Sequence, residues 1–184
     1  MQGIIFNALE EYVLEKAGME LWNSVIDDSK VASGGIYTAR GKYDDAEIIA
    51  LTTTLSEKLA LSLNDCLNIF GEFLFNYLVD RGPIKVKDYT NLQSLLSELE
   101  SVIYGGVKLI NPDTYTPLLE YIPRDENSGE LVYRSNRQLC PIAEGVIKGL
   151  AKHYYPSIIF SHTQCMHDDY ESCKWNLIFT RVIV

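Results

Sequence analysis

The spacing of the apolar residues changes once along this chain, close to Pro112, and this change limits the folds that the chain can adopt. Before Pro112 the apolar residues recur at the spacing of amphipathic helices. After Pro112 short runs of β-branched and aromatic residues alternate with polar turns, which is typical of strands. The sequence therefore predicts an α+β protein in which an N-terminal helical part packs on an antiparallel sheet.

Five helices are expected in the first part. The first begins at Ile4 and stops at Gly18, because glycine often ends helices. The fourth has Asn64 as its N-cap and carries apolar residues around most of its circumference, so it should lie centrally. The other three are expected over residues 20–26, 43–61 and 92–109.

The second part should contain strands and one helix. Residues 118–122 and 130–137 have the pattern of two paired strands that flank a polar turn. A helix is expected over residues 141–154, and further strands over 157–161 and 175–184. These strands would form the sheet on which the helical part packs.

Composition and charge exclude several classes of function. With 184 residues, of which 47% are hydrophobic, the chain can bury a core as a single domain. Its net charge of −9 argues against nucleic acid or an anionic membrane as a partner. No apolar run is long enough to span a bilayer and no signal peptide is evident, so we expect a cytoplasmic protein.

The sequence also gives no reason to expect an enzyme. It contains no evident nucleophile–base pair, paired catalytic carboxylates or phosphate-binding glycine loop. The acidic pairs Glu10-Glu11 and Asp44-Asp45 are interpreted as solvated helix faces. Four cysteines in a reducing compartment suggest metal ligands or redox thiols rather than disulfides, although Cys66 is most simply a core residue.

Two hydroxyls and one guanidinium stand at alternate positions in the segment Tyr133-Arg134-Ser135-Asn136-Arg137. On a strand, alternate side chains lie on one face, so Tyr133, Ser135 and Arg137 should point together. Such a set of donors suits a pair of carboxylates or a phosphate, which the guanidinium can bind bidentately. The alternative is a solvated strand face with a surface salt bridge.

Three cysteines and one histidine in the second part have the composition of a tetrahedral zinc site. Cys140 lies near the start of the expected helix. His162, Cys165 and Cys173 lie at a strand end and near the next strand, so a hairpin can bring them together. His167 can replace His162 as the nitrogen ligand. The alternative is a set of isolated cysteines with surface histidines.

Over essentially its whole length the chain resembles the bacterial H-NOX family, the haem-nitric oxide/oxygen binding domains related to the sensor domain of soluble guanylate cyclase. The resemblance covers the motifs Gly3-Ile4-Ile5-Phe6-Asn7, Gly18-Met19-x-Leu21-Trp22, Phe70-Gly71-x2-Leu74-Phe75, Tyr-x-Ser-x-Arg at 133–137, and Ala143-Glu144-Gly145. It implies a single H-NOX domain, with a distal helical subdomain over residues 1–65. The proximal α/β subdomain would span residues 66–184 and contain a four-stranded antiparallel sheet.

The resemblance also assigns site residues. The family's Tyr-x-Ser-x-Arg motif binds the haem propionates, so this role falls on Tyr133, Ser135 and Arg137. A zinc ion held by Cys, His, Cys and Cys in a bacterial branch of the family would fall on Cys140, His162, Cys165 and Cys173.

The haem pocket of the family matches four further positions. Ile5 and Leu78 match the distal wall, and Pro117 matches the proline that presses on the haem and distorts it. Ile142 falls where oxygen-binding members carry a hydrogen-bonding tyrosine. Because isoleucine offers no donor, the resemblance implies a preference for NO over oxygen.

One position departs from the family pattern. The proximal histidine that holds the haem iron is replaced by Tyr104, and the only histidines of the chain are His153, His162 and His167. Tyr104 can ligate the iron as tyrosinate. Alternatively, the protein binds no haem and senses oxidation through a zinc-thiolate site. In the third interpretation Tyr104 only packs, and haem binds without an axial protein ligand.

The resemblance implies a stand-alone sensor of NO or another small diatomic ligand. Such a sensor would change shape and regulate a separate partner, a histidine kinase or a cyclic-di-GMP enzyme. The alternative is a haem-free homologue that senses oxidation.

Overall fold

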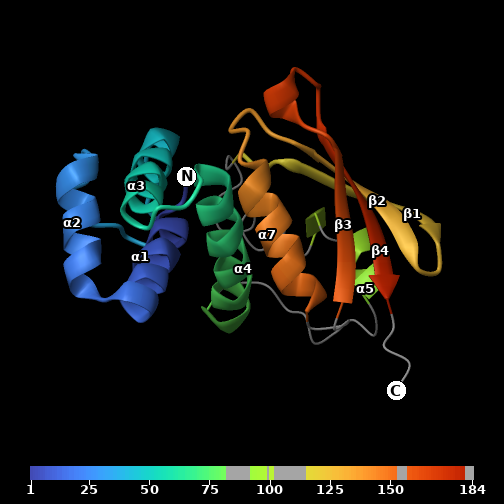
Figure 1. Cartoon of the computed structure of the whole chain (residues 1–184), viewed down its shortest axis with the longest axis horizontal. Coiled ribbons are helices and arrows are strands. Elements are labelled where there is room, and N and C mark those ends of the chain that lie inside the picture. The colour runs from blue at the N-terminus through green and yellow to red at the C-terminus, as the bar shows by residue number, and fades with distance from the viewer. Residues whose placement is uncertain (82–91, 99, 102–114, 153–156, 181–184) are drawn as a thin grey trace.

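The helical part of the chain forms one end of the molecule, and the sheet forms the other (Figure 1). The computed structural model describes residues 1–81, 92–98, 100–101, 115–152 and 157–180. Its helices are α1 (Gly3–Ala17), α2 (Met19–Ser29), α3 (Asp45–Lys58), α4 (Leu63–Arg81), α5 (Leu92–Ser97), α7 (Cys140–Ala151) and the short 3-10 helix η1 (Met166–Asp168). Its strands are β1 (Leu118–Asp125), β2 (Ser128–Arg134), β3 (Ser157–Gln164) and β4 (Cys173–Thr180). The predicted α+β class is confirmed.

The helix ends follow local capping chemistry. The predicted stop of α1 at Gly18 is confirmed, and glycine suits the φ of 84° found there. The prediction that Asn64 caps α4 is wrong: the Ser62 hydroxyl accepts the backbone N–H of Asp65 at 3.0 Å, as N-cap side chains do. The third helix is shorter than predicted, because the carboxylate of Asp44 accepts the N–H of Ala46 at 2.9 Å and starts the helix at Asp45. Most of the predicted helix 92–109 lies outside the described residues.

Helix α4 lies at the centre of the molecule, as predicted, and packs side by side with α7 (Figure 1). The two helices approach closely at glycines. A Cβ atom on Gly145 would lie 2.0 Å from the carbonyl oxygen of Asn68, and one on Gly71 would lie 2.4 Å from that of Ile142. Only glycine permits this separation of the backbones, so α4 and α7 form one tightly packed pair.

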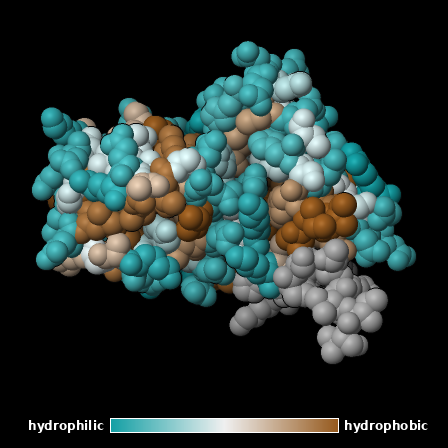
Figure 2. All heavy atoms as spheres, viewed as in Figure 1, coloured by the Kyte–Doolittle hydropathy of each residue, from teal (hydrophilic) through white to brown (hydrophobic). Residues whose placement is uncertain are grey.

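The four strands form an antiparallel sheet in the order β1-β2-β4-β3. Its inner face is buried and includes Leu119, Tyr121, Leu131, Tyr133, Trp175, Leu177 and Phe179. The opposite face exposes the cross-strand pair Ile159 and Ile178, where Figure 2 shows an apolar patch over β3 and β4. The sheet thus presents one face to the core and one to solvent.

The ends of the predicted strands need correction. The strand predicted over 130–137 ends at Arg134, because Gln138 donates its N–H to the carbonyl of Ser135 at 3.0 Å and turns the chain. The final strand begins at Cys173, two residues before the predicted start. In the part of the chain that the structure describes, no helix has the length and apolarity needed to cross a bilayer.

Candidate cofactor and metal site

The predicted carboxylate-binding residues lie at the end of β2 and in the loop that leads to α7. Tyr133 is on the strand, whereas Ser135 follows its last residue and Arg137 lies in the turn. The prediction that all three share one strand face is therefore wrong for Arg137. We call Tyr133, Ser135 and Arg137 the donor triad, and residues 135–139 the triad loop.

Arg137 is held by an internal carboxylate. Its Nε donates to Oδ2 of Asp45 at 2.5 Å, and Nη1 donates to the carbonyl of Tyr115 at 3.3 Å. The guanidinium also lies over the ring of Tyr115, 4.8 Å from its centroid. The other oxygen of Asp45 accepts the N-terminal ammonium of Met1 at 2.6 Å. Asp45 therefore joins the chain terminus and α3 to the triad loop.

The interpretation of Asp45 as part of a solvated helix face is wrong, because its carboxylate is paired on both oxygens. Partial burial opposes ionisation, but hydrogen bonds from Arg137 and the N-terminal ammonium outweigh it and lower the pKa of Asp45 below its ordinary value. Sequence spacing does not reveal this contact, because Asp45 and Arg137 lie 92 positions apart.

Tyr133 and Ser135 point into the protein rather than into solvent. Both are buried, and the Ser135 hydroxyl accepts the backbone N–H of Arg137 at 3.2 Å. Burial raises the pKa of Tyr133 to about 12, against the opposing effect of hydrogen bonds with the Ser135 side chain and the Leu139 backbone. The tyrosine hydroxyl thus reaches from β2 into the triad loop and helps to fix it.

The chemistry of Arg137 fits an external carboxylate. A guanidinium carries five N–H donors. Two of the Arg137 nitrogens, Nε and Nη1, have protein acceptors, and Nη2 contacts no acceptor among the described residues. Arg137 can therefore bind an external carboxylate while it keeps Asp45.

Three of the four predicted metal ligands meet at one point. The sulfurs of Cys140, Cys165 and Cys173 all lie within 4.8 Å of one another. The Cys140–Cys165 and Cys165–Cys173 sulfur separations are 3.9 and 4.0 Å. In a tetrahedral site with Zn–S bonds of about 2.3 Å, the sulfurs are about 3.8 Å apart. The thiols are thus spaced as zinc ligands require. We call these three residues the thiol cluster.

The cluster is assembled by three elements. Cys140 is the first residue of α7, Cys165 directly follows β3, and Cys173 begins β4. The β3–β4 hairpin therefore brings Cys165 and Cys173 together, whereas His162, which the prediction also placed there, does not join the group of sulfurs. Burial raises the pKa values of Cys140 and Cys173, and the neighbouring Cys165 thiol raises both further. Three thiolates at this separation repel one another, and a divalent cation would neutralise that repulsion.

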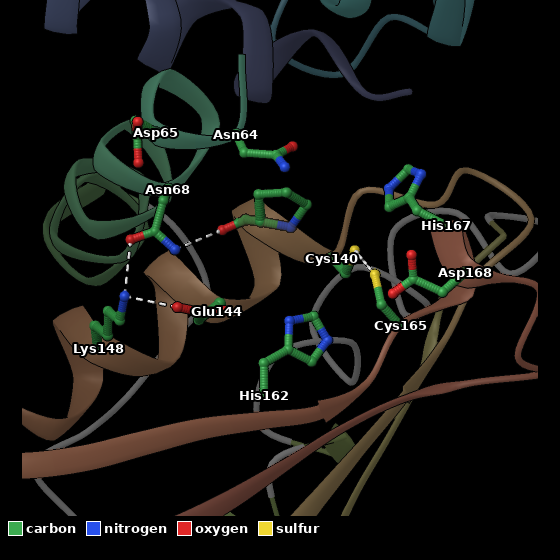
Figure 3. Close-up of a pocket in the computed structure, with 11 residues that line it drawn as sticks. Asn64, Asp65, Asn68, Cys140, Glu144, Lys148, His162, Cys165, His167 and Asp168 are labelled. Carbon is green, nitrogen blue, oxygen red and sulfur yellow. Dashed lines mark hydrogen bonds and ion pairs between the residues drawn. The ribbon is translucent and has the colours of Figure 1, made fainter. Parts of the chain in front are cut away.

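The two candidate histidine ligands lie on either side of Cys140 and Cys165 (Figure 3). The ring of His162 stacks on Trp175 with centroids 4.7 Å apart, and Nε2 of His167 lies 3.0 Å from the carbonyl oxygen of Gln138. Both line a cavity of about 390 Å³ that also borders the two cysteines. Among the described residues, no histidine nitrogen lies within 4.8 Å of all three sulfurs.

The residues predicted for the haem pocket lie on several elements. Ile5 is on α1 and Leu78 on α4, both half-buried, and Ile142 is buried on α7. Pro117 directly precedes β1, whose first residue pairs with Arg134, so it lies at the same end of the sheet as the triad. Tyr104 and His153 fall outside the described residues.

Two contacts at this site were not expected from the sequence. The buried indole of Trp175 donates to Oε2 of Glu144 at 2.8 Å, and Oε1 of Glu144 pairs with Lys148 at 2.6 Å. Tyr115 forms the platform under Arg137 and accepts the N–H of Asn136 through its hydroxyl at 2.8 Å. The spacing of Glu144 and Lys148 on one helix signals their pair, but the contacts with Trp175 and Tyr115 depend on the fold.

Comparison with known proteins gives a consistent result. The profile of the haem-NO-binding family matches residues 2–162. The structure is similar to an H-NOX protein from Shewanella oneidensis in the Fe(II)NO ligation state, with 29% identity, a TM-score of 0.89, and coverage of 98% of this chain and 100% of that one. It is also similar to the Fe(II) unliganded H-NOX protein from K. algicida, with 26% identity, a TM-score of 0.85, and coverage of 100% and 99%.

A curated relative is longer. Soluble guanylate cyclase 89Db of Drosophila melanogaster is 24% identical over 160 residues, which are 84% of this chain and 23% of that protein. The chain therefore spans about a quarter of the length of the curated relatives that it matches. From the matched profile, the fold and the sequence motifs together, the chain belongs to the haem-NO-binding family of H-NOX proteins.

Proposed function

We propose that this protein is a haem-based sensor of NO, in which Tyr133, Ser135 and Arg137 hold the haem propionates. The observation that carries the proposal is the position of Arg137. Asp45 and Tyr115 fix its guanidinium, whose remaining N–H donors can bind a carboxylate. Bound haem would supply an iron centre that takes up a diatomic gas. The contribution of the chain is to bind and orient the propionates through charge-assisted hydrogen bonds.

The distal residues support NO as the ligand. Ile5, Leu78 and Ile142 are apolar and provide no hydrogen-bond donor for oxygen. Pro117 would press on the haem from the end of the sheet that carries the triad. We infer that these four residues form the walls of the gas site.

In this proposal Tyr104 would hold the haem iron as tyrosinate. An anionic oxygen ligand favours ferric iron, so the ferrous NO complex should form less readily than with histidine. Tyr104→His should therefore increase ferrous NO binding, and Tyr104→Phe should shift the Soret band of the ferric protein. An unchanged ferric spectrum in Tyr104→Phe would exclude tyrosinate ligation while leaving haem binding intact.

We further propose that the sensor acts in the cytoplasm on a separate signalling protein, a histidine kinase or a cyclic-di-GMP enzyme. Its four unpaired cysteines fit a reducing compartment. By this proposal the domain is a regulator without catalytic activity of its own. To test this, the haem-loaded protein is added, with and without NO, to a purified enzyme of this kind from the same genome. The rate of that enzyme should change in only one of the two cases, with NO or without it.

The experiment for NO sensing begins with protein reconstituted with haemin and reduced. Addition of NO should shift the absorption spectrum and saturate at one NO per haem, while oxygen should leave the reduced spectrum unchanged. A stable complex with oxygen would contradict the role assigned to Ile142. No spectral change with NO would contradict NO sensing itself.

A second function is favoured by the thiol cluster. In a haem-free sensor, hydrogen peroxide would oxidise two of the thiols, with formation of one S–S bond, loss of two protons and two electrons, and reduction of peroxide to two water molecules. Cys165 is the best placed of the three, because its sulfur lies 3.9 Å from that of Cys140 and 4.0 Å from that of Cys173. Zinc would be released as its ligands are lost. A signal requires that the oxidation can be reversed. If peroxide releases zinc and dithiothreitol does not restore zinc binding, that result would argue against a signalling role.

A further inference from the structure

The donor triad and the thiol cluster share one short stretch of chain. Ser135 and Arg137 lie in the triad loop, and Cys140 directly follows it as the first residue of α7. Gln138, in the middle, adopts a left-handed conformation with φ of 52° and donates its N–H to the carbonyl of Ser135 at 3.0 Å. Only two residues separate Arg137 from Cys140 within this hydrogen-bonded turn, so the backbone positions of the two residues are linked.

A second connection runs through the sheet. Tyr133 of β2 is paired in register with Cys173 of β4. The Tyr133 ring packs against the buried Trp175 with centroids 6.3 Å apart. One member of the triad is therefore the strand partner of one member of the thiol cluster.

A third connection is made by η1. The N–H of Met166 donates to the sulfur of Cys173 at 3.2 Å, which fixes this turn to the thiol cluster. The next residue, His167, then contacts the carbonyl oxygen of Gln138 in the triad loop, with 3.0 Å between Nε2 and oxygen. His167 is the only side chain of η1 that bonds to the triad loop among the described residues.

We propose that the thiol cluster, closed around a zinc ion, holds the triad in its carboxylate-binding form, with His167 as the positioning residue between the two sites. The inference rests on the proposed function, because it takes the triad to bind porphyrin carboxylates. Zinc occupancy then sets the affinity for the porphyrin, and by thermodynamic reciprocity the porphyrin strengthens zinc binding. This assigns His167 to the support of the triad rather than to the metal.

The coupling is tested with iron-free protoporphyrin IX, which carries both propionates and needs no axial ligand. The porphyrin is titrated into the full chain loaded with zinc and into the same protein after removal of zinc by a chelator. Binding is followed by the porphyrin fluorescence. We expect the dissociation constant to rise by about tenfold or more on zinc removal, a coupling of the usual size. The dimethyl ester of the porphyrin, which lacks the carboxylates, should show no such dependence.

Variants of His167 separate positioning from metal binding and from loss of fold. His167→Ala should keep one zinc per chain and weaken porphyrin binding several-fold, and His167→Gln, which retains a donor for the Gln138 carbonyl, should restore it. Tyr170→Ala, an exposed change in the same connection between β3 and β4, is the matched control and should leave the affinity unchanged.

The outcomes are distinct. The coupling would be overturned if the porphyrin affinity were the same with and without zinc, or the same in His167→Ala as in the wild type. Neither result would contradict the proposed function. Loss of zinc in His167→Ala would show a metal ligand instead of a positioning residue. Failure of the zinc-loaded wild type to bind the porphyrin at all would contradict the proposed function itself.

Discussion

Arg137 and Asp45 form an ion pair of 2.5 Å between the triad loop and the first turn of α3. The same carboxylate holds the N-terminal ammonium at 2.6 Å. The pair therefore connects the helical end of the molecule directly to the residues proposed to hold the haem propionates. A propionate that binds Arg137 would therefore act directly on the contact between the triad loop and α3.

The first prediction concerns the pH dependence of this pair. Because the pKa of Asp45 is lowered in the folded protein, its stabilising effect is complete above the ordinary value of 3.8 and is lost as the pH falls through the lower folded value. Asp45→Asn should therefore lower the urea midpoint at pH 7, and the difference from the wild type should shrink as the pH falls below 3.8 and through the lowered pKa of the folded protein.

Asp28→Asn, which removes a more exposed ion pair with Lys58, is the control and should change the midpoint little. A difference between Asp45→Asn and the wild type that persists unchanged in acid would show that Asp45 acts by another route.

Sequence patterns predicted the fold class, the antiparallel sheet and the identity of three clustered cysteines, because each depends on local periodicity or on ligand chemistry. The end of β2 was misplaced, since Ser135 and Gln138 form a turn that alternating residue types do not reveal. Asp45 was missed for a different reason. An acidic residue at a helix start has the same local pattern whether it is solvated or paired with a distant arginine.

The second prediction concerns the crossing of α4 and α7. Gly145→Ala would place a Cβ atom 2.0 Å from the backbone oxygen of Asn68, which cannot move away without displacing the helix. The expected loss in unfolding free energy is about 1–3 kcal/mol. Gly149→Ala, whose nearest contacts would be at 3.0 Å, should cost much less, because the better helix propensity of alanine offsets the crowding. Urea unfolding that ranks the two variants in the opposite order would refute this packing.

The third prediction concerns Glu144 and the buried Trp175. Glu144→Ala removes the acceptor of the indole N–H and should cost about 1–3 kcal/mol of unfolding free energy. Glu144→Gln keeps an acceptor of similar length and should cost less. Urea denaturation and tryptophan emission check both, and equal losses in the two variants would indicate that the 2.8 Å contact contributes nothing specific.

The fourth prediction separates Cys66 from the thiol cluster. Cys66 is buried in α4, and burial raises its pKa to about 11, so it should resist thiol reagents until the protein unfolds.

Cys165→Ala should lose the zinc ion, whereas Cys66→Ala should keep one zinc per chain. Metal analysis after dialysis decides between these outcomes, and a protein that contains no zinc when isolated under reducing conditions would remove the basis for the metal site.

The most direct measurement of the central claim is a haemin titration of the wild type, Arg137→Ala and Arg124→Ala, followed by the Soret absorption. Arg124 forms a surface ion pair with Glu130 at 3.0 Å and serves as the matched control. We expect saturation at one haem per chain in the wild type and in Arg124→Ala, with an affinity at least about tenfold lower in Arg137→Ala, because that variant loses a charge-assisted contact with a carboxylate. Saturation with equal affinity in all three proteins would contradict the propionate role of the triad, and the absence of saturable binding in the wild type would contradict haem binding.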